Sequence, residues 1–208
     1  MLQIHGLKYS YDGQAEISYP DWEVEKGNHA LILGNSGCGK TTLLHLIGGL
    51  MQPSAGHLEI EGEDLAKKSS AKLDKFRGEN IGIVFQKPHL VKSLTVRENL
   101  LLAQYLGKKE QGSKRVNEVI EHLGISELAN RKVHQISQGQ AQRVSIARAV
   151  VNSPKLLLAD EPTASLDDEN CMKVIDLLRS QAEETGATLI VATHDHRVKS
   201  EFQNQLSL

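Results

Sequence analysis

Two kinds of apolar run alternate along the chain, and they predict two kinds of β-strand. Nearly continuous apolar runs are typical of strands that are covered on both faces of a parallel sheet. Four such runs occur, at 29–33, 81–85, 156–159 and 188–192. Shorter runs closed by Gly, Asn or Asp are typical of small antiparallel strands, and they occur at 2–7, 16–24 and 57–60. The pattern therefore predicts a buried parallel sheet with an antiparallel sheet beside it.

Helical spacing of apolar residues appears between these strands. It predicts helices over 40–49, 96–106, 113–123, 138–151 and 169–184. Because strands alternate with helices, the predicted fold class is α/β. The stretch 87–152 has helical patterns and no strand pattern, so we expect a helical subdomain inserted into a core made of 1–86 and 153–208. The charge-rich segment 61–80 is interpreted as a solvated connector.

The composition narrows the classes of partner and the compartment. A chain of 208 residues with 39% hydrophobic content can bury the core of one domain with an inserted lobe. A net charge of −2 and 4% aromatic residues disfavour nucleic acid as a partner. Cys38 and Cys171 are far apart and predict no disulfide framework, and no run approaches the roughly 20 apolar residues that span a bilayer. We therefore expect a protein of the reducing cytoplasm.

A glycine-rich loop lies between the first buried strand and the first helix. Its residues match the phosphate-loop pattern G-x-x-x-x-G-K-[ST] and are Gly34, Asn35, Ser36, Gly37, Cys38, Gly39, Lys40, Thr41 and Thr42. The glycines let backbone N–H groups turn inward, and the helix N-terminus adds a positive dipole end for phosphate. We expect Lys40 to reach the β and γ oxygens of a nucleotide, Thr41 to place its hydroxyl on Mg²⁺, and Thr42 to contact phosphate. The alternatives are a glycine turn without a ligand and, for Cys38, a redox switch in place of a spectator side chain.

Polar side chains follow three of the buried strands. Asp160 and Glu161 follow the strand at 156–159, Gln86 follows 81–85, and His194 comes just after 188–192. Ligands bind at this carboxyl edge in open α/β sheets. We expect Asp160 and Gln86 to hold Mg²⁺, Glu161 to orient or deprotonate an attacking water, and His194 to contact the γ-phosphate. The alternatives are a solvated Asp-Glu turn, a polar strand end and a surface histidine.

Together these residues resemble the nucleotide-binding subunit of ABC transporters over essentially the whole chain. The six motifs stand in the family's order: 34–42 resembles Walker A, Gln86 the Q-loop, 136–143 the signature motif, 156–162 Walker B with its catalytic Glu161, 165–167 the D-loop, and His194 the switch histidine. The resemblance implies a P-loop NTPase core, with a mostly parallel sheet and an antiparallel β-subdomain, plus an inserted α-helical subdomain. It implies ATP and Mg²⁺ as ligands. It also implies that Tyr11 stacks on adenine, with Tyr9 as the rival and packing on the core as the alternative for both.

The resemblance further implies that two such subunits, as a homodimer, pack head to tail around ATP. Each nucleotide would lie between the Walker A loop of one copy and the signature motif of the other. Ser137 and the N–H groups around Gly139 would meet the γ-phosphate, Gln140 would position the turn, and Asp167 would act across the interface. The transmembrane permease is expected to be a separate polypeptide, which would hold this subunit peripherally on the inner face of the cell membrane.

The signature segment departs from the family pattern LSGGQ at Ile136 and Gln138. If the position of Gln138 required a positive φ, a side chain there would cost roughly 1 kcal/mol or more. If the position is helical or extended, Gln138 only adds a side chain at the interface. We favour the second interpretation, because the helix that begins there has a normal pattern with Arg143 and Arg148 on its polar side. The departure bears on the rate of turnover rather than on nucleotide binding.

Residues 88–100 and Ala159 resemble the ATPases of lipoprotein-release and of macrolide or peptide export. We expect a cytoplasmic helix of the permease to dock in a groove beside Gln86 that is lined by Pro88, Leu90, Leu94 and Leu100; the alternative is that these leucines are the core of the helical lobe itself. A soluble or division-type ABC ATPase that moves a non-transport partner is the competing function. A P-loop kinase or GTPase would carry an acceptor site or an NKxD motif, and the sequence has neither.

Overall fold

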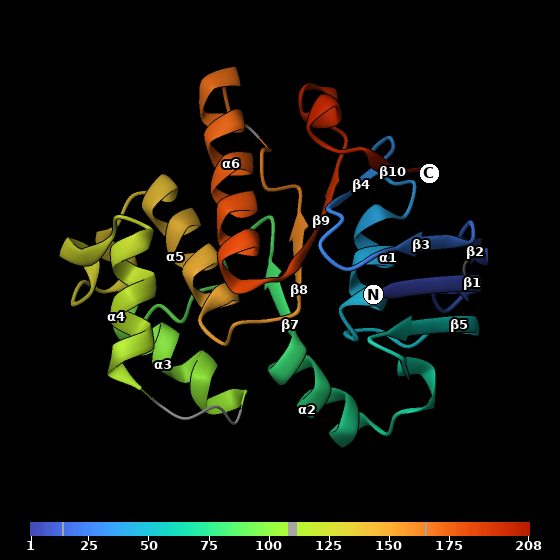
Figure 1. The fold of residues 1–208 in the computed structure, drawn as a ribbon, viewed down its shortest axis with the longest axis horizontal. Coiled ribbons are helices and arrows are strands. Elements are labelled where there is room, and N and C mark those ends of the chain that lie inside the picture. The colour runs from blue at the N-terminus through green and yellow to red at the C-terminus, as the bar shows by residue number, and fades with distance from the viewer. Residues whose placement is uncertain (14, 108–111, 165) are drawn as a thin grey trace.

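Five parallel strands form the central sheet of the computed structural model, which describes residues 1–13, 15–107, 112–164 and 166–208 (Figure 1). In order across the sheet they are β10 (Asn204–Ser207), β4 (Ala30–Leu33), β9 (Thr188–Thr193), β8 (Leu156–Asp160) and β7 (Ile81–Val84). The four predicted strands are all present, and the predicted α/β fold class is confirmed. β10 escaped prediction because its sequence NQLS has a single apolar residue.

The antiparallel sheet is built around β1 (Leu2–Tyr9). Its other strands are β2 (Ile17–Ser18), β3 (Trp22–Val24), β5 (Ala55–Ile60) and β6 (Glu63–Asp64). The single run predicted at 16–24 is therefore wrong, since it forms two short strands that both pair with β1. Between them Pro20 has no N–H to donate, and the Asp21 carboxylate accepts the N–H of Gly6 at 2.7 Å instead.

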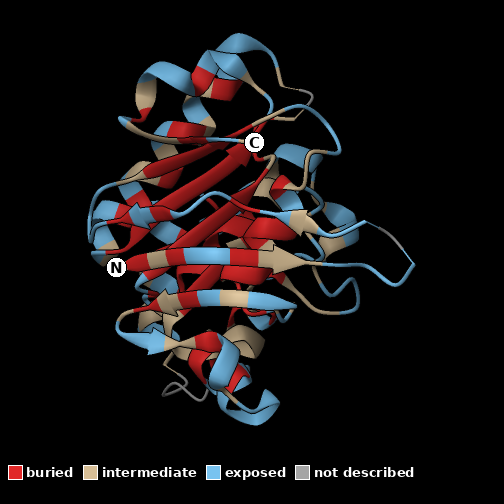
Figure 2. Cartoon of the chain, turned by 90° about the vertical axis from the view of Figure 1, so that its right-hand side faces the viewer, coloured by how far each residue is buried: buried red, intermediate tan, exposed pale blue. Residues whose placement is uncertain are grey.

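Alternate residues of the parallel strands enter two different hydrophobic cores. In β8, Leu157 and Ala159 belong to one core, whereas Leu156 and Leu158 belong to the other. The second core lies toward the antiparallel sheet and α1 (Lys40–Ile47). Figure 2 shows the central strands as almost wholly buried. A strand buried on both faces cannot alternate apolar and polar residues, which explains the continuous runs in the sequence.

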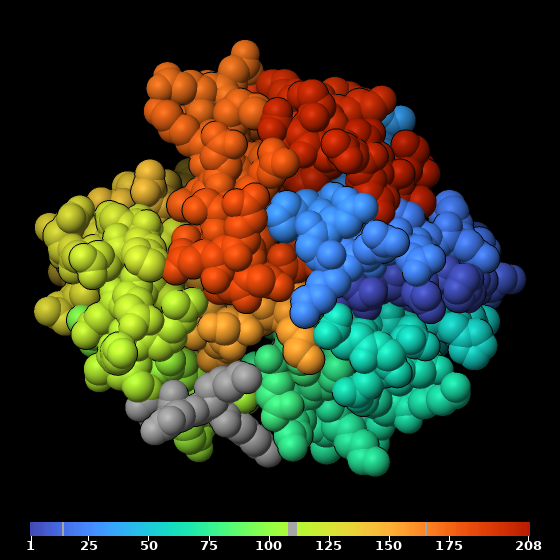
Figure 3. Space-filling model, in the orientation of Figure 1, coloured from blue at the N-terminus to red at the C-terminus, as the bar shows by residue number. Residues whose placement is uncertain are grey.

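Helices cover the other face of the parallel sheet. They are α3 (Val96–Leu106), α4 (Ser113–His122), α5 (Gln138–Val150) and α6 (Asp168–Thr185). In Figure 3 the residues of α3 to α5 gather on one side of the molecule and the N-terminal strands on the other. None of the helices in the part of the chain described is long and apolar enough to cross a membrane.

The segment 61–80 is not the solvated connector that its charge suggested. It contains β6, a 3₁₀ turn at Leu65–Lys67 and α2 (Ser70–Asn80). Leu73 and Phe76, three residues apart on one face of α2, are buried in the core beside α1. With only two large apolar residues, this helix has too narrow a stripe for the pattern to reveal it.

Candidate functional site

The glycine-rich loop turns between β4 and α1 with the backbone that its glycines allow. Gly37 and Gly39 have φ of 83° and 102°, in the left-handed region that side chains rarely adopt. Gly34 is favoured for a different reason, because a Cβ there would lie 2.9 Å from the backbone oxygen of Leu208 and 2.5 Å from Sγ of Cys38. The loop is therefore a tight backbone cradle that ends at the N-terminus of a helix, as predicted.

Lys40 lies at the centre of this cradle with only 5% of its side chain exposed. Its Nζ donates to the carbonyl oxygens of Gly34 and Asn35 at 2.9 and 3.0 Å, and it lies 3.4 Å from Oε1 of Glu161. A buried ammonium requires such partners, because an unpaired one is costly to desolvate. The loop thus presents one cation and several N–H groups to an anion.

Asp160 and Thr41 lie side by side at the base of the loop. The Thr41 hydroxyl donates to Oδ1 of Asp160 at 3.2 Å. Burial raises the pKa of the Asp160 carboxyl, and the hydrogen bond from Thr41 acts against that rise. Thr41 and Gln86 line one cavity, and Asp160 adjoins it through Thr41. Their hydroxyl, amide and carboxylate oxygens are the donor type that fits Mg²⁺, which takes its remaining ligands from phosphate and water.

Glu161 and His194 form a hydrogen-bonded pair. Nδ1 of His194 lies 3.0 Å from both carboxylate oxygens of Glu161, and the Thr193 hydroxyl donates to Oε2 at 2.9 Å. Burial, the largest influence, would raise the pKa of Glu161, but the hydrogen bonds from His194 and Thr193 together with nearby positive charge hold it below its ordinary value. Glu161 is therefore an ionised carboxylate with an oriented imidazole beside it.

The backbone of Glu161 is strained, which the sequence did not predict. Its φ is 45°, a left-handed conformation that costs about 1–3 kcal/mol for a residue with a side chain. The Glu161 N–H donates to the carbonyl of Ala192 at 2.7 Å, so the neighbouring strand fixes this turn. The strain directs two adjacent carboxylates, Asp160 and Glu161, to different partners.

A cavity of about 340 Å³ brings most of the predicted residues together. Its walls consist of Tyr11, Ile17, Ser36, Gly37, Gly39, Lys40, Thr41, Thr42, Gln86, Glu161 and His194. The predicted loop residues Gly34, Asn35 and Cys38 lie behind this lining, where the first two bind Lys40 through their carbonyl groups. Asp160 adjoins the cavity through Thr41. Ser137, Gly139, Gln140 and Asp167 are not part of the lining.

Tyr11 lies at the cavity, and Tyr9 does not. The Tyr11 hydroxyl lies 2.8 Å from the Thr42 hydroxyl, and its ring meets the ring of Tyr9 edge to face with centroids 4.8 Å apart. Tyr9 packs against the core below the antiparallel sheet. Of the two tyrosines, Tyr11 is therefore the one that lines the cavity.

The signature segment begins α5 with a complete capping box. Ser137 Oγ accepts from the N–H of Gln140 at 3.2 Å, and Gln140 Oε1 accepts from the N–H of Ser137 at 2.9 Å. Gln138 is the first residue of the helix, so the expected helical backbone at this position is confirmed, and the place of its side chain at an interface stays a prediction. Ser137, Gln138 and Gly139 are exposed. The segment is thus an exposed helix N-terminus that does not line its own chain's cavity.

Asp167 begins α6 in a similar way. Its carboxylate accepts the N–H of Asn170 at 2.8 Å and the side-chain amide of the same residue at 2.9 Å. These bonds hold the pKa of Asp167 below its ordinary value. Of the predicted D-loop, Ser165 lies outside the described residues.

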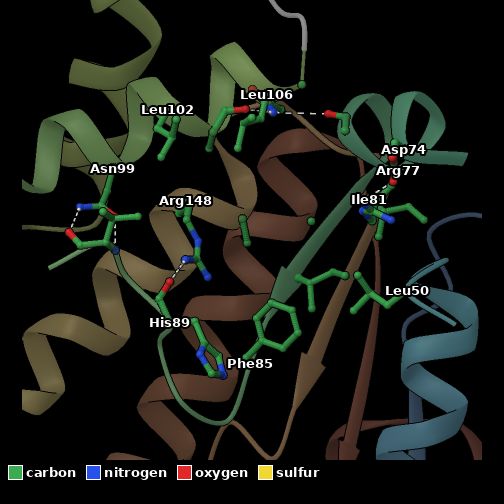
Figure 4. Close-up of a pocket in the computed structure, with 18 residues that line it drawn as sticks. Leu50, Asp74, Arg77, Ile81, Phe85, His89, Asn99, Leu102, Leu106 and Arg148 are labelled. Atoms are coloured by element: carbon green, nitrogen blue, oxygen red, sulfur yellow. Dashed lines mark hydrogen bonds and ion pairs between the residues drawn. The ribbon is translucent and has the colours of Figure 1, made fainter. Parts of the chain in front are cut away.

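A second hollow of about 620 Å³ lies beside Phe85, the residue before Gln86 (Figure 4). The predicted lining of this groove is wrong: Leu100 is buried in the core, Leu90 packs against that core, and neither Pro88 nor Leu94 lines the hollow. The walls instead include Leu50, Val91, Leu102, Leu106 and Arg148.

Arg148 was expected on the polar side of α5 but lines this groove. It is partly buried and donates to the carbonyl of His89 at 2.7 Å, and burial lowers its pKa.

Comparisons with known proteins agree with this geometry. Residues 18–164 match the family described as ABC transporter. The chain is 36% identical to the lipoprotein-releasing system ATP-binding protein LolD of Shewanella frigidimarina, over all of this chain and 90% of that protein. It is 34% identical to LolD of Bacteroides thetaiotaomicron, over 94% of this chain and 90% of the relative.

Solved structures give the same result. The dimeric structure of MJ0796, a bacterial ABC transporter cassette, is similar with a TM-score of 0.89 and 33% identity over all of this chain and 94% of the other. A post-hydrolysis dimer of MJ0796 bound to ADP and Pi matches equally well, with the same TM-score, identity and coverage. The protein cbiO1 of Clostridium perfringens, part of the transporter complex cbiONQ, has a TM-score of 0.87 and 30% identity over 99% of this chain and 83% of its own.

Proposed function

Because this chain belongs to the ABC transporter family and is an ATP-binding subunit that hydrolyses ATP, we propose that two copies pair head to tail around ATP and drive a separate transmembrane permease. One observation carries the proposal. The 340 Å³ cavity collects the loop, the Thr41–Asp160 pair and the Glu161–His194 pair, yet Ser137, Gly139 and Gln140 are absent from its walls. A helix N-terminus with exposed N–H groups binds anions, so the signature turn of a second copy can close the open side. The dimeric form of the similar cassette MJ0796 supports this arrangement.

The residues of the cavity divide the work of phosphoryl transfer. Backbone N–H groups of the loop and Lys40 hold the β- and γ-phosphates, and Tyr11 stacks on adenine. Mg²⁺, held by Thr41, Asp160 and Gln86, would neutralise charge on the phosphate oxygens. Ionised Glu161 orients or deprotonates the attacking water, and His194 contacts the γ-phosphate. The catalytic effect is positioning and charge, for which the strained turn at Glu161 fixes the carboxylate.

The chain is proposed to divide into a core, 1–86 and 153–208, and a helical signature subdomain, 87–152. The packing of α3 on α4 and α5 supports a common helical body, and α5 joins it to β7 of the core. Such a division lets the signature turn move relative to the loop that it faces in the partner.

The 620 Å³ groove is proposed to hold a cytoplasmic helix of the permease. Leu50, Val91 and Leu106 line it and are among the large apolar side chains that the described surface leaves exposed. Clustered exposed apolar residues are typical of protein interfaces. The subunit would then be a peripheral protein of the inner membrane face, and the similarity to LolD proteins supports export, with lipoprotein or peptide-like molecules as the transported class.

Glu161→Gln tests the proposed function. The amide keeps the shape of the side chain but cannot accept a proton, so turnover should fall about a hundredfold or more, while ATP binding persists. With ATP and Mg²⁺ the variant should elute as a dimer in size-exclusion chromatography. The control is Glu161→Gln combined with Lys40→Ala, which should remain monomeric because the loop lacks its cation. Turnover at the wild-type rate would remove Glu161 from its role, and an ATP-loaded monomer would contradict the pairing.

A further inference from the structure

Arg197 forms hydrogen bonds with the residues on both sides of Asp167. Its Nη2 donates to the backbone carbonyl of Leu166 at 3.2 Å, and its Nη1 donates to the Asp168 carboxylate at 2.5 Å. Asp167 itself is engaged by Asn170. One guanidinium therefore holds both neighbours of the residue that would act across the subunit interface.

The same guanidinium is fixed from the other side by Asp195. Nε and Nη2 of Arg197 donate to the two carboxylate oxygens of Asp195, at 2.8 and 2.6 Å. Asp195 Oδ2 also accepts from the Thr163 hydroxyl at 3.1 Å. These bonds hold the pKa of Asp195 far below its ordinary value, so both partners are charged. A bidentate, charge-assisted pair of this kind holds its two side chains in one defined geometry.

Asp195 is linked in turn to the catalytic carboxylate. It directly follows His194, and its N–H donates to the Thr193 hydroxyl at 3.0 Å. That hydroxyl donates to Glu161 Oε2 at 2.9 Å. A small cavity of about 240 Å³ has both Glu161 and Arg197 in its wall. A continuous set of hydrogen bonds thus runs from the 166–168 turn through Arg197 and Asp195 to Glu161.

We propose that Arg197 is a positioning residue that fixes the 166–168 turn to the His194 loop, so that contact of Asp167 with a second subunit sets the geometry of Glu161 in its own subunit. The inference rests on the proposed pairing of two copies. Arg197 does not line the 340 Å³ cavity, and it acts through Asp195 and the 166–168 turn.

The chain offers a matched control for ordinary structural loss. Arg179 on α6 pairs with Glu201 at 2.9 Å, in the 3₁₀ segment His196–Glu201 that also contains Arg197. This pair joins the same two elements as the Arg197–Asp168 contact, but it lies outside both cavities that contain Glu161. If Arg197 only attached this segment to α6, removing Arg179 would have the same effect.

The experiment compares Arg197→Ala, Arg197→Lys and Arg179→Ala. The single variants are used to measure steady-state ATP hydrolysis. The same substitutions in the Glu161→Gln background are used to measure ATP-driven dimerisation. Affinity for a fluorescent ATP analogue is measured on the single subunit, and unfolding by urea is followed for all. Lysine keeps a charge beside Asp195 but cannot bridge three acceptors, so it should restore stability without restoring turnover.

Both Arg197 variants should lower kcat about tenfold, because small displacements at a reacting group are costly. They should also raise the ATP concentration needed for dimerisation, while nucleotide affinity of the single subunit changes less than about twofold. Arg179→Ala should leave turnover and dimerisation at the wild-type level. Equal turnover in the Arg197→Lys and Arg179→Ala proteins would overturn the inference. If Glu161→Gln alone fails to dimerise with ATP, the pairing itself is wrong; if it dimerises and Arg197 variants behave like Arg179→Ala, only the role of Arg197 is wrong.

Discussion

Gln138 begins α5 with a helical backbone and an exposed side chain, so no strain is relieved by glycine at this position. We predict that Gln138→Gly leaves nucleotide affinity unchanged and keeps turnover at or above the wild-type rate, because a side chain is removed from the proposed interface. The helix start should lose up to about 1 kcal/mol of unfolding free energy, as glycine is a poor helix former. ATP hydrolysis and urea unfolding measure the two effects. Loss of ATP-driven dimerisation would show that the Gln138 side chain itself is part of the interface.

At the residue scale, the sequence predicted which side chains lie together around the cavity. The loop residues, Gln86, Glu161 and His194 stand at strand ends, and strand ends of a parallel sheet must converge. The left-handed backbone of Glu161 could not be predicted, because a glutamate side chain carries no signal for a positive φ. Arg197 and Asp195 were missed for a similar reason: charged residues in a turn are ordinary until their partners are known.

At the scale of elements, α3 offers a direct comparison between neighbours. Leu106 lines the 620 Å³ groove and is 67% exposed, whereas Tyr105 is 64% exposed and does not line it. We predict that Leu106→Ser weakens retention of the transmembrane partner about tenfold or more, since burial of a leucine side chain contributes about 1.5–3 kcal/mol. Tagged subunit recovered from detergent-solubilised membranes gives the measurement. The isolated Leu106→Ser subunit should hydrolyse ATP normally.

Tyr105→Ser is the control for that experiment and should retain the partner. Equal retention by the two variants would place the docking surface elsewhere.

The sequence predicted where helices begin and end more accurately than which of their side chains stay exposed. Periodicity located α3 to its last residue, whereas of the two positions considered for Leu100, the groove and the core of the helical lobe, the structure shows the core. The spacing of residues along one helix shows which face is apolar. It does not show which part of that face a neighbouring element covers.

At the scale of the whole molecule, a half-buried histidine links two strands of the central sheet. Nδ1 of His29, just before β4, accepts the N–H of Leu189 in β9 at 3.1 Å. Burial, and secondarily the charge of Arg179, lowers the pKa of His29 from its ordinary value of about 6.5. The neutral form is favoured by folding, so its contribution to stability is complete above the ordinary pKa and is lost as pH falls through the lower, folded value.

We therefore predict that the unfolding free energy falls as pH drops below about 6.5, and that His29→Asn reduces this fall. Asparagine keeps an acceptor near Nδ1 but does not titrate. Urea unfolding across this pH range gives the measurement, and replacement of the exposed His134 by Asn is the control. An unchanged pH dependence in His29→Asn would contradict the assignment.

The sequence predicted the class of the fold but not the order of the strands in the parallel sheet. Continuous apolar runs indicated a sheet covered on both faces, and the two cores on either side of β8 match that expectation. The strand order was not contained in any local pattern, because it depends on which edges pair after the chain crosses over. β10 and α2 gain their places from the cores that they close, and their own sequences carry little apolar signal.

The absence of the signature residues from the 340 Å³ cavity has a consequence for genetics. In a head-to-tail pair, a copy defective at Lys40 still lends an intact signature turn, and a copy defective at Ser137 still carries an intact loop. Two inactive alleles of these kinds, expressed together, rebuild one wholly normal site and place both lesions in the other. The gene for this subunit should therefore show complementation between these two kinds of allele, because the mixed pair contains one site with neither lesion.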